Sequence, residues 1–317
     1  MHLARPYGLI LIALAACKVE DARKLTADSI AAARKATTIA NAPKPAGTAT
    51  GFHEPESARY DSALDIFFVS NINGAPAAKD GNGFISRVRP DGTIDSLMFI
   101  AGGRGGVTLN APKGLAITGD TLWVADIDVV RAFDKRSGAP LATVDLRPLG
   151  AAFLNDIAAA PDGSLYITDT GPNSVSDKTH GNRIFSVGPG RRPAVALHSD
   201  SLESPNGITW DARGKRFIIV QWGGRHILAW RPGEPQPRTI GFGASQSDGV
   251  EVLADGRLIF TSWAEHAIII HYGAEEFTVR GFSAPADFGV DTRRHRLALP
   301  VMDKDRVEFW DIPPLSR

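Results

Sequence analysis

One position in a repeated sequence pattern carries a polar or charged residue in five of its six copies. Four of these five residues bear carboxylate or amide oxygens, the donors that hard divalent cations such as Ca²⁺ and Mg²⁺ prefer. No His or Cys occupies the position, which disfavours a zinc ion held by imidazole or thiolate. A metal centre and a polar, water-filled channel are both compatible with this set. The aligned residues are Glu56, Lys113, Asn155, Asn206, Asp248 and Ala286.

The repeat that carries these residues predicts the fold. Each copy contains a short apolar run, a turn and a hydrophobic strand, and successive copies are 57, 42, 51, 42 and 38 residues apart, a mean of 46. Six copies of this length indicate an all-β fold, a six-bladed β-propeller with four-stranded blades around a central channel. The aligned residues begin the innermost strands, so we expect them to converge on the channel. Ring closure is expected to pair residues 306–310 with strand material near the N-terminus.

Four tripeptides in phase with the repeat, PES, LND, PNG and SDG, carry a resemblance to a known family. In this order they resemble the gluconolactonase/regucalcin (senescence marker protein) family of six-bladed propellers, and the related diisopropyl fluorophosphatase group, over about residues 55–311. The resemblance implies one divalent cation at the channel centre, with Ca²⁺ favoured over Mg²⁺, Mn²⁺ and Zn²⁺. The ligands it implies are Glu56, Asn206 and Asp248, with Asn155 either binding the metal or lying next to the substrate.

Departures from the family pattern bear on the substrate. The first motif reads PESARYD, where the family more often has Glu-Gly-Pro followed by an aromatic residue. Phe153 stands where sugar-lactone members often carry an arginine that contacts substrate, which puts a sugar-acid lactone in doubt. Lys113 adds a cation that could bind an anionic group of the substrate or pair with Glu56 or Asp248. We therefore expect Asn155, Phe153 and Lys113 to contact a small-molecule substrate.

The activity that these features favour is metal-dependent hydrolysis of a lactone or related ester. Asp248 would serve as ligand and general base, and Lys113 would stabilise the developing oxyanion. A serine nucleophile is not supported, because the sequence lacks a Gly-x-Ser-x-Gly elbow. Two alternatives stay open: a non-catalytic propeller that binds a ligand or protein, and a structural propeller without metal, similar to NHL-type repeats.

Several polar and aromatic residues outside the aligned position could also lie near the channel. Asp156 and Asp287 follow it by one residue, and strand alternation predicts that they turn away from the channel to pack blades. His53 and His180 are the two histidines to test for proximity to the channel mouth. Trp222 and Trp263 follow strands of two motif-bearing blades and could line the pocket.

The N-terminus predicts export and lipidation. Residues 8–16 form an apolar run shorter than the approximately 20 residues that span a bilayer. Leu14-Ala15-Ala16-Cys17 resembles the bacterial lipobox, which implies a signal peptide over 1–16, lipidation of the only cysteine and a flexible tether over 17–50, before a propeller over 51–317. The protein would be lipid-anchored through Cys17 on the periplasmic or cell-surface side of a bacterial membrane.

Charge excludes one further class. The chain has 35 basic and 35 acidic residues, whereas nucleic-acid binders need a basic surplus. We expect a monomer that binds no nucleic acid.

Overall fold

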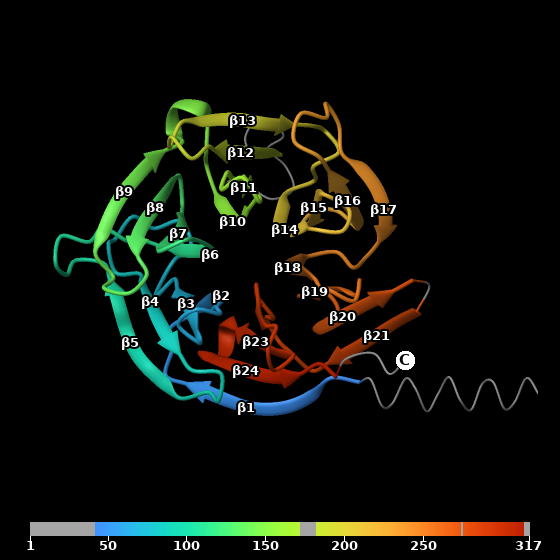
Figure 1. The fold of residues 1–317 in the computed structure, drawn as a ribbon, viewed down its shortest axis with the longest axis horizontal. Helices are drawn as coiled ribbons and strands as arrows, with labels where there is room; N and C mark the ends of the chain where they lie inside the picture. Colours follow the sequence, from blue (N-terminus) through green and yellow to red (C-terminus); the bar gives the residue numbers. More distant parts are fainter. Residues whose placement is uncertain (1–41, 172–181, 274, 314–317) are drawn as a thin grey trace, which may run out of the picture. The chain divides into compact units, whose positions relative to one another are not determined.

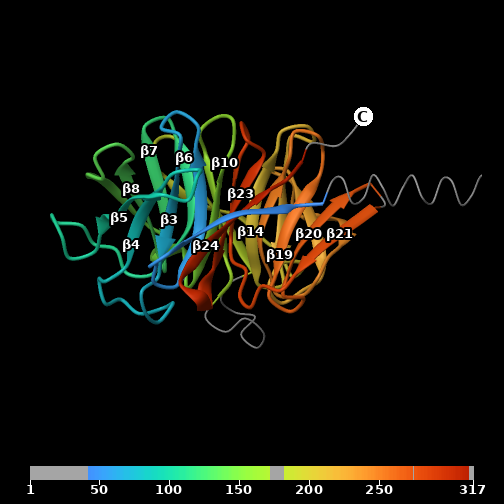
Figure 2. The same ribbon diagram turned by 90° about the horizontal axis from the view of Figure 1, so that it is seen from below.

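The computed structural model describes residues 42–171, 182–273 and 275–313. In these residues 24 strands form six four-stranded antiparallel sheets, which stand as the blades of a ring in Figure 1. The predicted all-β, six-bladed propeller is therefore confirmed. Seen edge-on in Figure 2, inner strands such as β10 and β14 run through the thickness of the ring.

Blades 1 to 5 each use four consecutive strands, from the channel outward. Blade 1 consists of β2 (Pro55–Asp61), β3 (Ile66–Asn71), β4 (Phe84–Val88) and β5 (Ile94–Ala101). Blade 2 consists of β6 (Pro112–Thr118), β7 (Thr121–Asp126), β8 (Val129–Asp134) and β9 (Pro140–Asp145). Blade 3 consists of β10 (Leu154–Ala159), β11 (Leu165–Asp169), β12 (Arg183–Val187) and β13 (Pro193–His198).

The second half of the ring repeats this order. Blade 4 consists of β14 (Pro205–Asp211), β15 (Arg216–Gln221), β16 (His226–Trp230) and β17 (Arg238–Phe242). Blade 5 consists of β18 (Ser247–Val252), β19 (Leu258–Ser262), β20 (Ala267–Tyr272) and β21 (Glu275–Arg280). Blade 6 contains β22 (Gly289–Asp291), β23 (Arg296–Val301) and β24 (Arg306–Asp311), with β1 (Lys44–Thr50) as its outermost strand. Two short 3₁₀ turns, Arg147–Leu149 and Met302–Lys304, complete the regular structure of the described residues.

The ring closes through strands from its two ends. β1 pairs antiparallel with β24, from Lys44 opposite Asp311 to Thr50 opposite Arg306, and the blue and red strands lie side by side in Figure 1. This confirms the predicted closure by residues 306–310. It also corrects the predicted domain boundary, because residues 44–50 form a strand instead of the end of a flexible tether. Their Pro and Gly are tolerated because β1 is an edge strand.

Apolar side chains between neighbouring blades hold the ring together. The described residues form one buried cluster at each blade–blade interface, such as Phe67 and Phe309 between blades 1 and 6. Burial of this kind is worth roughly 25 cal/mol per Å² of apolar surface. The channel lining is therefore free to be polar, because the blades are stabilised elsewhere.

The predicted signal peptide, Cys17, the tether up to residue 41 and His180 lie outside the described residues. Within the described residues, no helix is long and apolar enough to cross a membrane.

Candidate functional site

Five of the six aligned residues meet in one pocket at the end of the channel. Each is the second residue of the first strand of its blade, in β2, β6, β10, β14 and β18. Ala286, the sixth, precedes β22 and is buried without lining the pocket. The pocket has a volume of about 470 Å³. Its polar lining consists of Glu56, Lys113, Asn155, Asn206, Asp248 and Thr170.

A recurring β-bulge aims these side chains inward. In all five blades the pairing between the first and second strands shifts register next to the aligned residue, for example between Pro55 and Ser57. A bulge adds one residue to a strand and re-aims a side chain. Residues three apart, such as Glu56 and Arg59, therefore both reach the channel, although regular alternation would place them on opposite faces.

Below the aligned residues, charged side chains tie blades together. Arg59 of blade 1 forms an ion pair with Glu251 of blade 5 and donates to the carbonyl of Leu115 in blade 2 at 2.9 Å. The hydroxyl of Thr209 in blade 4 donates to the other Glu251 oxygen at 2.8 Å. Arg59 thus crosses the channel beneath the pocket.

Asp156 and Asp287 pack blades, as their position predicts. Oδ2 of Asp156 accepts the N–H of Ile208 in the next blade at 2.8 Å. Oδ2 of Asp287 accepts the hydroxyl of Ser57 at 2.5 Å. Neither residue lines the pocket.

Close approach of inner strands explains the glycine of the PNG motif. A Cβ at Gly207 would lie 2.2 Å from the carbonyl oxygen of Asp248 in the next blade, so only glycine fits. This glycine brings the strands that carry Asn206 and Asp248 together.

Three buried oxygens in the pocket have no hydrogen-bond partner. They are Oε2 of Glu56, Oδ1 of Asn206 and Oδ1 of Asp248. Buried polar atoms are nearly always paired in folded proteins, so such atoms call for an explanation. Asn155 donates its Nδ2 to the hydroxyl of Thr170 at 3.0 Å, which leaves its Oδ1 as the atom available to a ligand. Four oxygens from four blades therefore fit a hard cation.

The ligand types of this candidate set differ from those of the commonest metal sites. No group of three or more His, Cys, Asp or Glu side chains arranged for a metal occurs in the described part of the chain. The candidate set has two carboxylates and two amides, and amide oxygens are ordinary Ca²⁺ ligands.

Burial and neighbouring charges disfavour the ionised form of the carboxyl groups in the pocket. Burial raises the pKa of Glu56 well above its usual range, and the nearby Asp248 raises it further, while Lys113 lowers it. Burial, followed by the charge of Asp287, raises the pKa of Asp248 to about 8, although a hydrogen bond from Trp263 lowers it. A bound cation would lower these pKa values, because it favours the ionised carboxylates.

Lys113 is held by carbonyl oxygens. Its Nζ donates to Pro76 at 2.8 Å and to Ala111 at 3.1 Å, and lies 4.3 Å from the centre of the Phe153 ring. Burial lowers the pKa of Lys113 to about 8, against the charge of Glu56. Of the two expected roles, pairing with Glu56 or Asp248 is wrong, because neither carboxylate forms an ion pair with this ammonium. The third N–H of the ammonium is left for a ligand.

A second aligned position, at which the sequence predicts only Trp222 and Trp263 as pocket residues, forms part of the wall of the pocket. It is the residue directly after the second strand of each blade. In five blades its N–H donates to the carbonyl of the residue two positions before the aligned residue, as from Trp222 to Ser204 at 2.9 Å and from Trp263 to Gln246 at 3.0 Å. We call these residues the rim. The rim residues that line the pocket are Ile72, Thr170, Trp222, Trp263 and Met302.

Left-handed backbone accompanies this arrangement in three blades. Glu54, Ser204 and Gln246 have φ of 49°, 53° and 50°. Each precedes by two residues an aligned residue with an unpaired oxygen. Left-handed non-glycine residues are uncommon and cluster at functional sites.

Of the remaining predicted pocket residues that the structure describes, three line the pocket and one does not. Phe153, Trp222 and Trp263 line the pocket. Trp263 also donates Nε1 to Oδ2 of Asp248 at 2.9 Å, which fixes that carboxylate. His53 does not line the pocket and stacks edge-on against Phe84.

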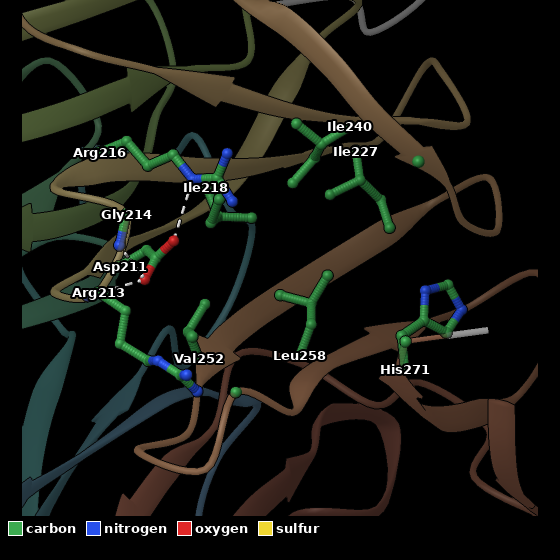
Figure 3. Close-up of a pocket in the computed structure, with 13 residues that line it drawn as sticks. Asp211, Arg213, Gly214, Arg216, Ile218, Ile227, Ile240, Val252, Leu258 and His271 are labelled. Atoms are coloured by element: carbon green, nitrogen blue, oxygen red, sulfur yellow. Dashed lines mark hydrogen bonds and ion pairs between the residues drawn. The ribbon is translucent and has the colours of Figure 1, made fainter. Parts of the chain in front are cut away.

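A second cavity of similar size lies between blades 4 and 5, away from the channel. Its volume is also about 470 Å³, and Figure 3 shows Arg216 bonded to Asp211 beside several isoleucines. None of the aligned residues lines it.

Comparison with known proteins agrees with this architecture. Residues 69–288 match the family model described as SMP-30/Gluconolactonase/LRE-like region. Because the match spans well over half of the chain, the protein belongs to that family. No match was found among curated protein sequences.

Solved structures of several enzymes share the fold. A gluconolactonase from Xanthomonas campestris is 17% identical, with a TM-score of 0.62, covering 84% of this chain and 87% of that one. A luciferin-regenerating enzyme is 12% identical, with a TM-score of 0.61 and coverages of 87% and 96%. Virginiamycin B lyase from Staphylococcus aureus is 15% identical, with a TM-score of 0.55 and coverages of 86% and 100%. These likenesses establish the fold, and their names span different reactions.

Proposed function

We propose that the protein is a divalent-metal-dependent hydrolase of a lactone or related ester. The observation that carries the proposal is the set of unpaired buried oxygens of Glu56, Asn206 and Asp248, which meet beside Lys113 in a pocket large enough for a small molecule. Membership of a family that includes gluconolactonases supports this class of reaction.

The residues fit one cation, with Ca²⁺ favoured and Mg²⁺, Mn²⁺ or Zn²⁺ possible. Glu56, Asn155, Asn206 and Asp248 would hold it through two carboxylates and two amides. When bound, the cation would polarise the substrate carbonyl and lower the pKa of water.

The protein side chains would then accept and return the proton and stabilise the developing negative charge. A water molecule gives its proton to Asp248 and its oxygen bonds to the carbonyl carbon. The ring C–O bond breaks, and the leaving oxygen takes that proton, so lactone and water become one hydroxy acid. Trp263 holds Asp248 in position, and Lys113 donates to the oxyanion or to a carboxylate of the substrate.

A panel of lactones and aryl esters tests the proposal. Protein stripped of metal by a chelator should be inactive and should recover with one of the four cations. Asp248→Ala should abolish the recovery. A folded, metal-loaded protein that turns over no member of the panel would favour the alternative, a binding propeller.

We further propose that Cys17 carries a lipid that anchors the protein outside the cytoplasm. The lipobox-like sequence before it supports this placement, and several acyl chains give stable attachment. Palmitate labelling should mark the wild type and not Cys17→Ser. A Cys17→Ser protein that stays on the membrane would refute the anchor.

A further inference from the structure

The wall of the channel pocket differs in chemistry from its floor. The floor carries the aligned polar residues, whereas the wall is built by four apolar rim residues together with Pro76, Ala77, Ala152 and Phe153. The four are Ile72, Trp222, Trp263 and Met302. We infer that the pocket selects lactones or esters with an apolar substituent, an alkyl chain or an aromatic ring, over polyhydroxylated sugar lactones. This inference rests on the proposed hydrolase function.

The polar groups of two wall residues, Thr170 and Trp263, are already engaged. The hydroxyl of Thr170, the polar rim residue, accepts from Asn155 at 3.0 Å and donates to the carbonyl of Pro205 at 2.8 Å. The indole N–H of Trp263 is used by Asp248. A sugar lactone would therefore bring several hydroxyls against a wall with little to offer them, and each unpaired hydroxyl lowers affinity.

Aromatic faces provide the surface for an apolar group. Trp222 and Trp263 pack edge to face, with ring centres 5.2 Å apart. Phe153 covers the ammonium of Lys113 on another side of the pocket. Apolar groups gain free energy on leaving water for such surfaces.

A backbone hydrogen bond that recurs in the blades holds these rim residues at the pocket. The N–H of Trp222, Trp263 or Met302 bonds to the carbonyl two residues before the aligned position of the same blade. In blades 4 and 5, one backbone hydrogen bond therefore joins the rim residue to the segment that leads into the polar floor residue. The rim therefore belongs to the substrate pocket, and its residue types define substrate specificity independently of the cation.

Paired substrates test the inference. A δ-lactone with a five-carbon alkyl chain should show a kcat/KM at least about tenfold above that of glucono-δ-lactone with the cation-loaded protein. Equal values, or a preference for the sugar lactone, would overturn the inference and leave the hydrolase function intact.

Variants locate the effect at the rim. Trp222→Gln should lower kcat/KM for the alkyl lactone by about tenfold more than it lowers kcat/KM for unsubstituted δ-valerolactone. Trp222→Phe should restore the alkyl preference. Phe242→Gln, at an outer-strand residue that is 68% exposed, should change neither substrate. Equal losses on both lactones in Trp222→Gln would contradict a role in specificity.

Binding of non-hydrolysed lactams separates this inference from the proposed chemistry. By calorimetry, the pentyl-substituted δ-lactam should bind at least about tenfold more tightly than the unsubstituted one, and Trp222→Gln should remove the difference. This result would stand even if no lactone were hydrolysed, an outcome that refutes only the hydrolase function. Equal lactam affinities would overturn the apolar selectivity.

Discussion

Two cavities of about 470 Å³ each have opposite chemistry in this propeller. In the cavity between blades 4 and 5 (Figure 3), Asp211 accepts the N–H of Arg213, the N–H of Gly214 and Nε of Arg216. In the channel pocket, Asp248 keeps one buried oxygen without any partner. The two cavities have the same volume. They differ in whether the buried oxygens of their aspartates all have hydrogen-bond partners.

The pKa values of the two aspartates move in opposite directions for this reason. Burial acts to raise both. The hydrogen bonds from Gly214 and Arg216 bring the pKa of Asp211 below its usual value, whereas the pKa of Asp248 rises to about 8. Asp211 is satisfied by its own blade, and Asp248 lacks a positive partner that a ligand could supply.

The largest expected effect comes from removing the charge of Asp248. Asp248→Asn should lower kcat/KM by about 100-fold or more, because the negative charge of the ligand and the proton acceptor are lost together. Asp211→Asn is the matched change in the other cavity. It should leave kcat/KM unchanged and lower the free energy of unfolding by about 1–2 kcal/mol. Comparable kinetic losses in both variants would erase the distinction between the cavities.

A glycine exchange tests the packing of the inner strands. Gly207→Ala should lower the free energy of unfolding by about 3 kcal/mol, because its Cβ would lie 2.2 Å from a backbone oxygen. Gly241→Ala, beside the other cavity, has no atom within 4 Å of its Cβ and should cost less than about 1 kcal/mol. Urea denaturation of both variants measures the difference, and equal costs would argue against the close approach.

The pH dependence of metal-free protein should follow the channel carboxyls. The pKa of Asp248 is about 8 in the folded state against 3.8 normally, and that of Glu56 is raised as well. The folded state therefore holds more protons than the unfolded state between these values, so stability falls as pH rises. The Tm of chelator-treated protein should decline from pH 5 to 8, and Ca²⁺ should reduce the decline. A Tm that rises over this range without metal would contradict the account.

The smallest effect is expected from filling the cavity between blades 4 and 5. Val252 lines it, and Val252→Ile adds one methyl group worth less than about 1 kcal/mol. Thermal denaturation should show a small gain, and kcat/KM should be unchanged. A large kinetic change would show that this cavity takes part in activity.

The blade count and the aligned floor residues were predictable because turns and polar strand starts recur in phase with the repeat. The rim was not fully predictable, since Ile, Thr, Trp and Met at one position share no chemistry that a repeat search recognises. The bulge was also hidden, because it depends on pairing between strands. Strand β1 was missed because KPAGTAT has a linker-like composition and mostly exposed side chains.

The roles of Asp156 and Asp287 were predicted, but from regular alternation alone. The bulge breaks that alternation, and the contacts of these residues with neighbouring blades come from the ring geometry. Lys113 was identified as part of the site, whereas its carbonyl partners were not, since Pro76 belongs to a loop with no repeat signature.

Calorimetric titration of the chelator-treated protein with Ca²⁺ at pH 7 is the most direct test of the metal centre. One cation should bind per chain, protons should be released because the carboxyls of Glu56 and Asp248 must ionise, and Asp248→Ala should abolish binding while Asp211→Ala leaves it unchanged. If Ca²⁺, Mg²⁺, Mn²⁺ and Zn²⁺ all fail to bind, or if binding persists in Asp248→Ala, the unpaired oxygens of the channel do not form a metal site.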